Sequence, residues 1–333
     1  MTWQQELVFS LRSTSDLNAY LLENNTELNI ADSDFPIFLP MKFMPRVLAS
    51  PVLIKQFIPT TEENNFLLQD AGFIDPIADT KCQVTKQIVH RYHNRALFIP
   101  TTHCPVHCRY CFRRNELQTN QFSMKDFAQS LSYLQEHPEI EEIIFTGGDP
   151  LILTNDKLDY FLKKFQEIPS IKFIRFHTRM PIIIPSRIDE GFLELLTKYQ
   201  KHFQKINMII HTNHMDEFDD AVNESLKKLP HFKTQSVLLK GVNDSVESLN
   251  QLFRHIISLG GDPYYLHHPD KVKGGMHFFL STQEGQEIYQ ELRQILPGWA
   301  LPRYVIDNEE GTGKELVSST SKFLPDLALR IDT

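Results

Sequence analysis

From residue 95 onward, short apolar segments alternate along the chain with longer amphipathic ones. The apolar segments are rich in β-branched and aromatic residues, as buried strands are. They cover residues 96–100, 142–145, 171–176, 206–210, 235–239 and 263–266. The amphipathic segments have the spacing of helices with one buried face, and they lie near residues 123–136, 155–167, 188–199, 216–229, 245–259 and 282–296. This alternation predicts parallel strands joined by right-handed helical crossovers.

The number of these units indicates the fold class. Six strand–helix units predict an α/β protein built as a partial (β/α)6 barrel, an incomplete relative of the (β/α)8 form. An open doubly wound sheet is the alternative. The segment before the barrel predicts mostly helical structure, with helical spacing at 6–11 and 17–23. We therefore expect three parts, which are an N-terminal helical cap at 1–94, the barrel at 95–296 and a C-terminal segment at 297–333.

Polar residues follow the predicted strands at their C-terminal ends, the side on which barrels of this kind carry their sites. The first strand leads into three cysteines, and the second into Thr146-Gly147-Gly148-Asp149-Pro150. The later strands are followed by His177 and Arg179, by His211, Asn213 and His214, by Lys240 and Asn243, and by His267, His268 and Asp270. Loops are polar in any protein, so this placement supports a shared site without proving one.

Three of the four cysteines, Cys104, Cys108 and Cys111, have the spacing C-x3-C-x2-C. Clustered thiolates select zinc, copper(I) or iron–sulfur. Three of them suit a [4Fe–4S] cluster with one open iron, whose sulfurs Tyr110 and Phe112 would shield from water. The alternative is a structural zinc site completed by His103 or His107. Cys82 stands alone, and we expect it to be a packing residue.

Three further segments contain candidate binding residues. Gly147-Gly148 would let a ligand approach the backbone closely, although an ordinary tight turn is the alternative. Arg91 and Arg95 would share one face if they lay on a helix, and a solvated basic turn is the simpler reading. Near the end of the chain, a short strand at 303–306 leads into a glycine-containing turn that ends at Lys314. An exposed loop lysine is the alternative there, and the spacing does not fit a phosphate-binding P-loop.

Composition narrows the class of partner. The chain has 333 residues, of which 41% are hydrophobic and 23% charged, as in soluble globular proteins. Its net charge of −8 argues against bare nucleic acid as the main partner. No segment is as long and apolar as a membrane span, and the first residues lack the features of a signal peptide. We expect a cytoplasmic protein whose thiols stay reduced.

Taken together, these motifs resemble those of the lysine 2,3-aminomutase family of radical S-adenosylmethionine (SAM) enzymes, which also use pyridoxal phosphate (PLP). The resemblance extends over residues 70–314. It rests on Cys104 through Cys111 followed by Arg113-Arg114, on Thr146 through Pro150, on Arg91-Tyr92 with Arg95, on Gln235 through Leu239, and on Asp270 and Asp307 through Lys314. The compact length is similar to that of members making β-lysine for elongation factor P.

The resemblance implies a partial barrel of the radical SAM type with a C-terminal PLP-lysine segment, and it implies a role for each matching residue. The three cysteines would hold the cluster, Gly147, Gly148 and Asp149 would contact SAM, and Lys314 would bind PLP covalently. Tyr92 would lie against the PLP ring, and Arg91, Arg95 and Gln235 would hold the phosphate. Arg113 would bind the substrate carboxylate, Asp270 and Asp307 the distant ammonium of lysine, and His211 and Asn213 would neighbour the cofactors.

The two aspartates also allow a physical argument about the substrate. A buried carboxylate is costly unless a cation meets it, and two that converge raise each other's pKa. Such a pair anticipates a positive charge between them and rejects substrates that end in a carboxylate. If only one aspartate were present, capping of a turn would be the simpler interpretation.

The implied reaction is a 1,2-amino shift that converts L-α-lysine into β-lysine. Its partners would be lysine, an external electron donor and, through the pathway, elongation factor P and its modifying ligase, with no nucleic acid or membrane. Only nineteen residues follow Lys314, so we expect a monomer or dimer without the assembly segment of larger relatives. Glu309 and Glu310 replace part of a glycine run in the family, which leaves the mobility of that loop open.

Two other functions remain open at this stage. One is the same rearrangement on another amino acid, or on lysine for osmolyte or antibiotic synthesis. The other is a zinc-stabilised binding module, for example for RNA.

Overall fold

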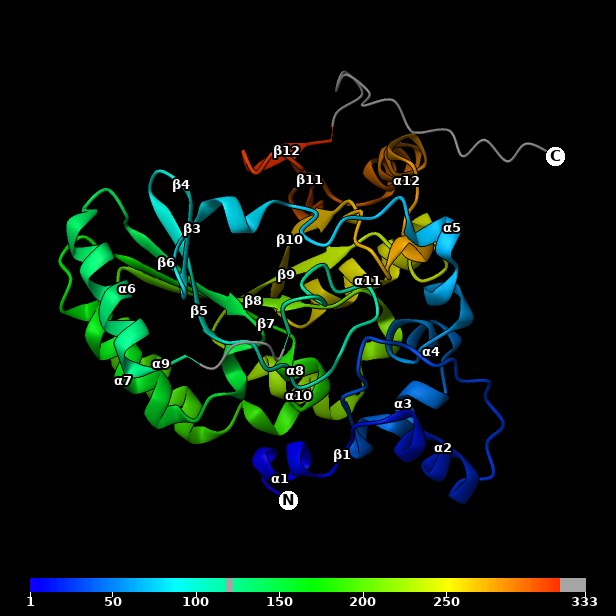
Figure 1. Cartoon of the computed structure of the whole chain (residues 1–333). Coiled ribbons are helices and arrows are strands. Elements are labelled where there is room, and N and C mark those ends of the chain that lie inside the picture. Colours follow the sequence, from blue (N-terminus) through cyan, green and yellow to red (C-terminus); the bar gives the residue numbers. More distant parts are fainter. Residues whose placement is uncertain (118–121, 318–333) are drawn as a thin grey trace.

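The central feature of the fold is a curved sheet of ten strands. The computed structural model describes residues 1–117 and 122–317, and within them the strand order is β12-β11-β10-β9-β8-β7-β6-β5-β4-β3 (Figure 1). Neighbouring strands from β5 to β11 pair in parallel, whereas β3–β4, β4–β5 and β11–β12 pair antiparallel. Since this order starts at β12 and ends at β3, the described sheet is open, as a partial barrel requires.

The predicted strands and helices form, with small shifts at their ends. The strands are β3 (Gln83–Thr85), β4 (Ile88–Tyr92), β5 (Arg95–Thr101), β6 (Glu142–Gly147), β7 (Phe173–Thr178), β8 (Lys205–His211), β9 (Phe232–Val237), β10 (Gly261–His267), β11 (Arg303–Asp307) and β12 (Lys314–Leu316). The helices after β5 are α6 (Met124–Glu136), α7 (Asn155–Gln166), α8 (Met180–Ile183), α9 (Glu190–Gln200), α10 (Asp220–Lys227), α11 (Val246–Ser258) and α12 (Thr282–Ile295).

Two boundaries differ for identifiable reasons. The apolar run at 235–239 continues past the end of β9, because Leu239 packs with Val242 and Phe278 in a small cluster of its own. The helix expected over 216–229 begins only at α10, where Asp219 caps it by accepting a hydrogen bond from the Val222 amide at 2.8 Å.

The N-terminal residues combine helices with strands. Helices α1 (Trp3–Val8), α2 (Thr14–Glu23), α3 (Met44–Leu48), α4 (Pro51–Phe57) and α5 (Phe66–Gln69) are accompanied by a small pair, β1 (Ser10–Leu11) and β2 (Leu39–Pro40). Strands β3 and β4 then join the large sheet beside β5. Arg91 and Arg95 therefore lie on the two strands of a hairpin and not on a helix.

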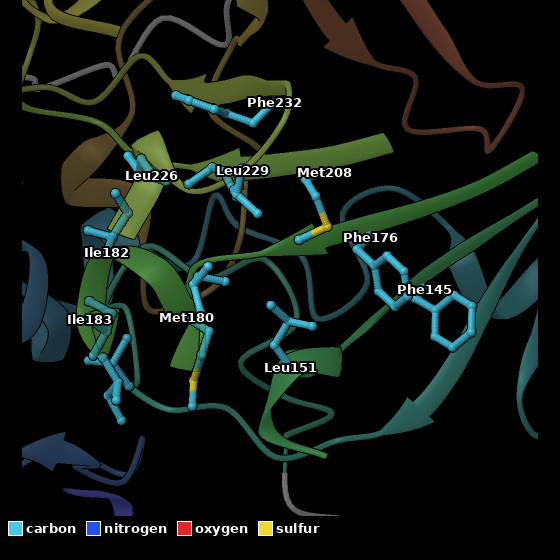
Figure 2. Close-up of a cluster of buried hydrophobic side chains, with 14 of the residues drawn as sticks. Phe145, Leu151, Phe176, Met180, Ile182, Ile183, Met208, Leu226, Leu229 and Phe232 are labelled. Atoms are coloured by element: carbon cyan, nitrogen blue, oxygen red, sulfur yellow. The ribbon is translucent and has the colours of Figure 1, made fainter. Parts of the chain in front are cut away.

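The main core lies between the sheet and the helices that cover its outer side. Figure 2 shows Phe145, Phe176 and Met208 from adjacent strands in one buried cluster that also includes Met180 and Ile182 of α8. The rings of Phe145 and Phe176 stack with centroids 4.6 Å apart. Burying each such side chain contributes about 1.5–3 kcal/mol, so this layer stabilises the packing of the helices on the sheet.

Alternation along the strands directs the other set of side chains inward. In β7, Ile174 and Phe176 are buried on the helix-covered face. Arg175 and His177 are on the opposite face of the same strand and line an internal cavity. Every helix within residues 1–117 and 122–317 is too short or too polar to cross a lipid bilayer.

Candidate active site

One cavity of about 540 Å³ brings together the two ends of the predicted site. Its lining includes the three cysteines from the loop after β5 and Lys314 from β12. The other predicted residues that line it are Arg91, Tyr92, Arg95, Arg113, Gly147, Gly148, Asp149, His211, Gln235, Asp270 and Asp307. Asn213 is the predicted residue that is absent from this lining.

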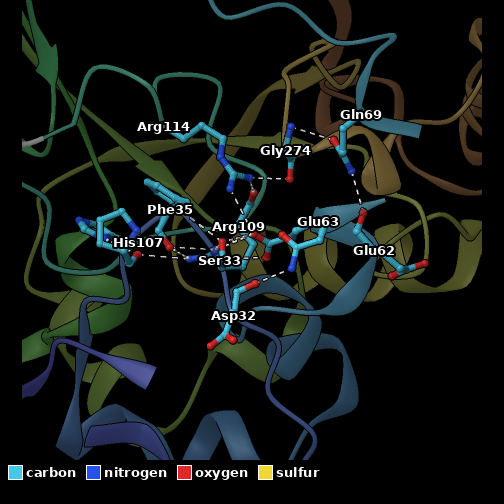
Figure 3. A network of polar contacts seen from close by, with 12 residues as sticks. Asp32, Ser33, Phe35, Glu62, Glu63, Gln69, His107, Arg109, Arg114 and Gly274 are labelled. Atoms are coloured by element: carbon cyan, nitrogen blue, oxygen red, sulfur yellow. Dashed lines mark hydrogen bonds and ion pairs between the residues drawn. The ribbon is translucent and has the colours of Figure 1, made fainter. Parts of the chain in front are cut away.

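The cysteine loop is held from behind by a buried ionic network, shown in Figure 3. The Arg109 guanidinium donates to both carboxylate oxygens of Glu63, from Nε at 2.7 Å and from Nη2 at 2.5 Å. Arg114 donates to the same carboxylate at 3.1 Å, and both guanidinium groups lie over the ring of Phe35. Because Arg109 turns away into this network, its neighbours Cys108 and Cys111 are left on the side of the loop that faces the cavity.

Neither loop histidine joins the cysteines. The His107 ring pairs with the Pro36 carbonyl at 2.9 Å and stacks on Phe35, while His103 is exposed. Within the described ranges, no three His, Cys, Asp or Glu side chains converge on a point that could hold a single ion. A [4Fe–4S] cluster binds each sulfur to a different iron and does not need three side chains to converge on one point, as a zinc site does.

The electrostatics of the cysteines are consistent with a cluster site. Burial raises the pKa of all three thiols, and mutual repulsion adds to the rise at Cys104 and Cys111. Metal binding would therefore have to displace protons from them. Arg179 places Nη1 3.5 Å from Cys108 Sγ and is held there by Glu217 at 2.8 Å. This buried cation would offset negative charge on bound sulfur.

The glycine turn after β6 lies directly against the cysteine loop. Gly147 has φ +105°, and a Cβ on Gly148 would meet the His103 carbonyl oxygen at 2.1 Å, so only glycine fits at these positions. The Asp149 carboxylate accepts hydrogen bonds from Thr178 Oγ1 at 2.7 Å and from the amides of Arg179 and Met180 at 2.6 and 3.1 Å. Asp149 thus ties the β6 and β7 loops together, while the glycine backbone is left facing the cavity.

At the other end, Lys314 is fixed by its backbone. Its amide donates to the Tyr92 phenol at 2.6 Å, and the Arg95 guanidinium lies 3.7 Å from the centroid of the Tyr92 ring. A Cβ on Gly313, which has φ +120°, would meet the same phenol oxygen at 2.6 Å. Glu309, one of the two glutamates in this turn, pairs with Lys271 at 3.1 Å. The β11–β12 hairpin is therefore locked against the β4–β5 hairpin.

Asp270 and Asp307 lie in contrasting electrostatic environments. Burial and the neighbouring Asp307 carboxylate raise the pKa of Asp270 to about 8. Burial would also raise the pKa of Asp307, but His267 at 3.7 Å and the Lys314 ammonium at 2.9 Å hold it below its usual range. Asp307 is thus the ionised member of the pair, and ionisation of Asp270 becomes favourable only when another cation binds nearby.

Asp79, which the sequence did not single out, links two of the predicted arginines. Its carboxylate accepts a hydrogen bond from Arg91 at 2.6 Å and forms an ion pair with Arg113. Asp79 follows Ala78, which has φ +53°, and no motif surrounds it. In the sequence, only the spacing between Asp79 and Arg91 hints at a contact between them, and that signal is weak.

Two histidines line the cavity between the two ends. His211 pairs with the Tyr110 phenol at 2.8 Å, and burial lowers its pKa well below the usual value, so its ring is neutral. His177 is likewise neutral, and its buried Nε2 has no hydrogen-bond partner among the residues that the structure describes. Asn213 instead braces the wall, since it donates to Gln56 at 3.1 Å and accepts from the Val237 amide at 2.9 Å.

Comparison with known proteins gives consistent matches. The Radical SAM superfamily model matches residues 98–253. The L-lysine 2,3-aminomutase of Escherichia coli (strain K12) is 34% identical over 304 residues, which are 89% of this chain and 85% of that protein. The enzyme of the same name from Haemophilus influenzae is 35% identical over 85% of each chain. The Bacillus subtilis protein of that name is 30% identical over 94% of this chain and 68% of its own.

Proposed function

Since this chain belongs to the lysine 2,3-aminomutase family of the radical SAM superfamily and is an isomerase, we propose that it converts L-α-lysine into β-lysine with PLP as a further cofactor. In this reaction the amino group moves from C2 to C3 and a hydrogen moves from C3 to C2, so the atoms balance within one molecule. The observation that carries the proposal is the single cavity lined by both the cysteine loop and Lys314.

The family implies a [4Fe–4S] cluster and SAM. When bound, these groups supply a hydrogen-abstracting 5′-deoxyadenosyl radical, and PLP supplies an aldehyde that holds the migrating amino group. Cys104, Cys108 and Cys111 would hold the cluster, and the Gly147-Gly148 backbone would lie against SAM. Asp149 would act through the loops that it ties together, because its hydrogen bonds are already made within the protein.

Lys314 would bind PLP covalently through Nζ. Tyr92 and Arg95 support this role by fixing the Lys314 backbone and by placing a ring and a guanidinium on the same wall. Arg91 and Gln235 would complete the phosphate contacts with Arg95. Arg91 and Arg113 both line the cavity, so each guanidinium can face an anionic group of a ligand.

Lysine itself would be held at both ends. Arg113 would bind its carboxylate with forked donors, and Asp270 with Asp307 would receive its distant ammonium. These contacts would fix C3 in the path of the radical, where a displacement of about 1 Å could cost roughly 100-fold in rate. The apolar remainder of the wall, with Val237, Leu239 and Phe278, excludes water from the reacting atoms.

We further propose that the β-lysine serves the modification of elongation factor P. The support is the resemblance of this chain to family members that make β-lysine for that factor. An external electron donor would reduce the cluster.

A substrate panel tests the reaction. The protein, loaded anaerobically with iron and sulfide, would be incubated with SAM, PLP and a chemical reductant together with L-lysine, L-norleucine or L-glutamate. Chromatography with mass spectrometry should detect β-lysine and no β-isomer of the other two. A β-isomer formed from another amino acid would show that lysine is not the specific substrate. A colourless protein with one bound zinc would contradict the presence of a [4Fe–4S] cluster.

A further inference from the structure

Lys314 occupies the place proposed for the substrate's ammonium. Its Nζ lies 2.9 Å from both carboxylate oxygens of Asp307, a symmetric contact with a side chain that is only 6% exposed. Within the described residues, the neighbouring Asp270 carboxylate accepts no hydrogen bond, and it lines the same cavity. Lys314, which belongs to the protein, thus makes the shortest cationic contact of Asp307, while Arg91 and His267 each lie 3.7 Å from that carboxylate.

A second ammonium cannot simply be added to this arrangement. Two ammonium groups against one acid pair would repel each other in a poorly hydrated cavity, where unit charges interact several times more strongly than in water. The substrate would have to displace Lys314 from Asp307, and Lys314 is tethered beside it. A tethered competitor acts at a high effective concentration and is not diluted away.

The release of Lys314 needs only its side chain to move. The backbone amide is held by Tyr92 at 2.6 Å, and the turn before it is closed by the Asn308 amide donating to the Gly313 carbonyl at 2.9 Å. The Lys314 side chain remains 31% exposed, so it has room to turn toward the cavity. Covalent attachment of PLP at Nζ would take up the ammonium that now pairs with Asp307, and the backbone hydrogen bonds of the hairpin do not involve Nζ.

We propose that Lys314 is the internal occupant of the substrate-ammonium site, so that PLP must bind before lysine can be held at its distant end. This inference rests on the proposed function, because it assumes that Asp270 and Asp307 receive the substrate's ammonium. It adds a second role for Lys314, which is to neutralise the acid pair and to block it until the cofactor is in place.

Isothermal titration of the PLP-free protein with lysine and with norleucine tests the inference without any catalysis. Norleucine has the same carboxylate and α-amino group but no distant ammonium. Lys314→Met should bind lysine about tenfold more tightly than the wild type, the effect expected for one freed charge-assisted contact, and its norleucine affinity should not change. Lys314→Gln, which keeps a polar end group but removes the charge, should show the same gain and serves if the methionine variant folds poorly.

Lys271→Met is the matched control, because Lys271 is a nearby lysine that pairs with Glu309 and not with the acid pair. Its lysine affinity should equal that of the wild type; an equal gain there would mean that long-range charge and not occupancy of the site explains the effect. If the Lys314 variants gain nothing while the PLP-loaded wild type makes β-lysine, the inference is wrong and the proposed function stands. If lysine and norleucine bind equally to every form, the acid pair does not recognise ammonium, and the substrate assignment fails too.

Discussion

The phenol of Tyr92 accepts a hydrogen bond from the backbone amide of Lys314 at 2.6 Å, although 222 positions separate the two residues in the sequence. This contact ties the last described hairpin to β4, which pairs with β5, the strand that precedes the cysteine loop. It explains how Lys314, near the end of the chain, is held at the same cavity as the cysteine loop, which lies near the end of the first third of the sequence.

Loss of this contact should weaken the hold on PLP. Tyr92→Phe keeps the ring beneath Arg95 but removes the acceptor for the Lys314 amide. We expect the PLP dissociation constant to rise by about 2–10-fold, which corresponds to one hydrogen bond of roughly 0.5–1.5 kcal/mol. Titration followed by PLP absorbance measures it, and Tyr160→Phe on α7 should leave the constant unchanged. Equal affinity in all three proteins would show that the Tyr92 contact does not support the cofactor.

Replacing Cys82 should affect the iron content differently from replacing any of the other three cysteines. Replacing Cys104, Cys108 or Cys111 by alanine should remove the brown colour and the bound iron and sulfide, because each thiolate would anchor a separate iron. Cys82→Ala should keep them, since Cys82 only contacts the Gly311 carbonyl at 3.7 Å. Iron and acid-labile sulfide analysis measures the result, and a Cys108→Ala protein with full iron content would contradict the assignment.

Arg179 should tune the reduction potential of the bound cluster. Its guanidinium lies 3.5 Å from Cys108 Sγ, and a nearby cation favours the more negative, reduced form. Arg179→Gln should therefore lower the midpoint potential in an anaerobic redox titration, and Arg179→Lys should lower it less. Iron content is the control, because a shift with intact iron separates tuning from loss of the cluster. An unchanged potential in Arg179→Gln would show that this charge is screened from the sulfur.

Asp270 and Asp307 should affect the pH dependence of stability in opposite directions. The pKa of Asp270 is raised to about 8, so the folded PLP-free protein keeps a proton that the unfolded chain releases above about pH 4. Folding stability should fall as pH rises from about 4 to 8, with a slope approaching 1.4 kcal/mol per pH unit for one proton. Asp270→Asn should remove this slope and gain stability at pH 8.

Asp307→Asn is the informative counterpart. Because the pKa of Asp307 is lowered, its carboxylate stabilises the fold above the unfolded pKa of about 4. The asparagine variant should lose that contribution throughout the neutral range and leave Lys314 without its partner. Urea denaturation at pH 5.5 and pH 8 measures both variants. A gain at pH 8 for Asp307→Asn, or a loss there for Asp270→Asn, would contradict the charge assignment of the pair.

Sequence reasoning predicted the fold well where burial leaves a local period. The β/α alternation was visible because each strand and helix buries one face, and that requirement is written into neighbouring residues. Arg91 and Arg95 show the limit. Their hairpin forms because β4 pairs with β5, which pairs with β6 some fifty positions later, and no local spacing records that pairing.

The residues of the candidate site also divide into those that short motifs indicate and those that only the fold brings together. The cysteine spacing, the double glycine and Lys314 lie in short motifs, so the sequence could identify them. Asp79 and the contact of Arg179 with Cys108 depend on segments brought together only by the fold. Asn213 lies two positions from His211, yet its side chain is absent from the cavity lining and hydrogen-bonds Gln56. Once a strand ends, alternation no longer determines which way a side chain points.

The central claim is that the cysteine loop and Lys314 act in one shared cavity. The most direct test is anaerobic incubation of the loaded enzyme with SAM, PLP, a reductant and lysine carrying deuterium at C3, followed by mass spectrometry. The shared cavity predicts deuterium in 5′-deoxyadenosine and in the β-lysine formed. Cleavage of SAM to unlabelled 5′-deoxyadenosine, with lysine recovered unchanged, would contradict it.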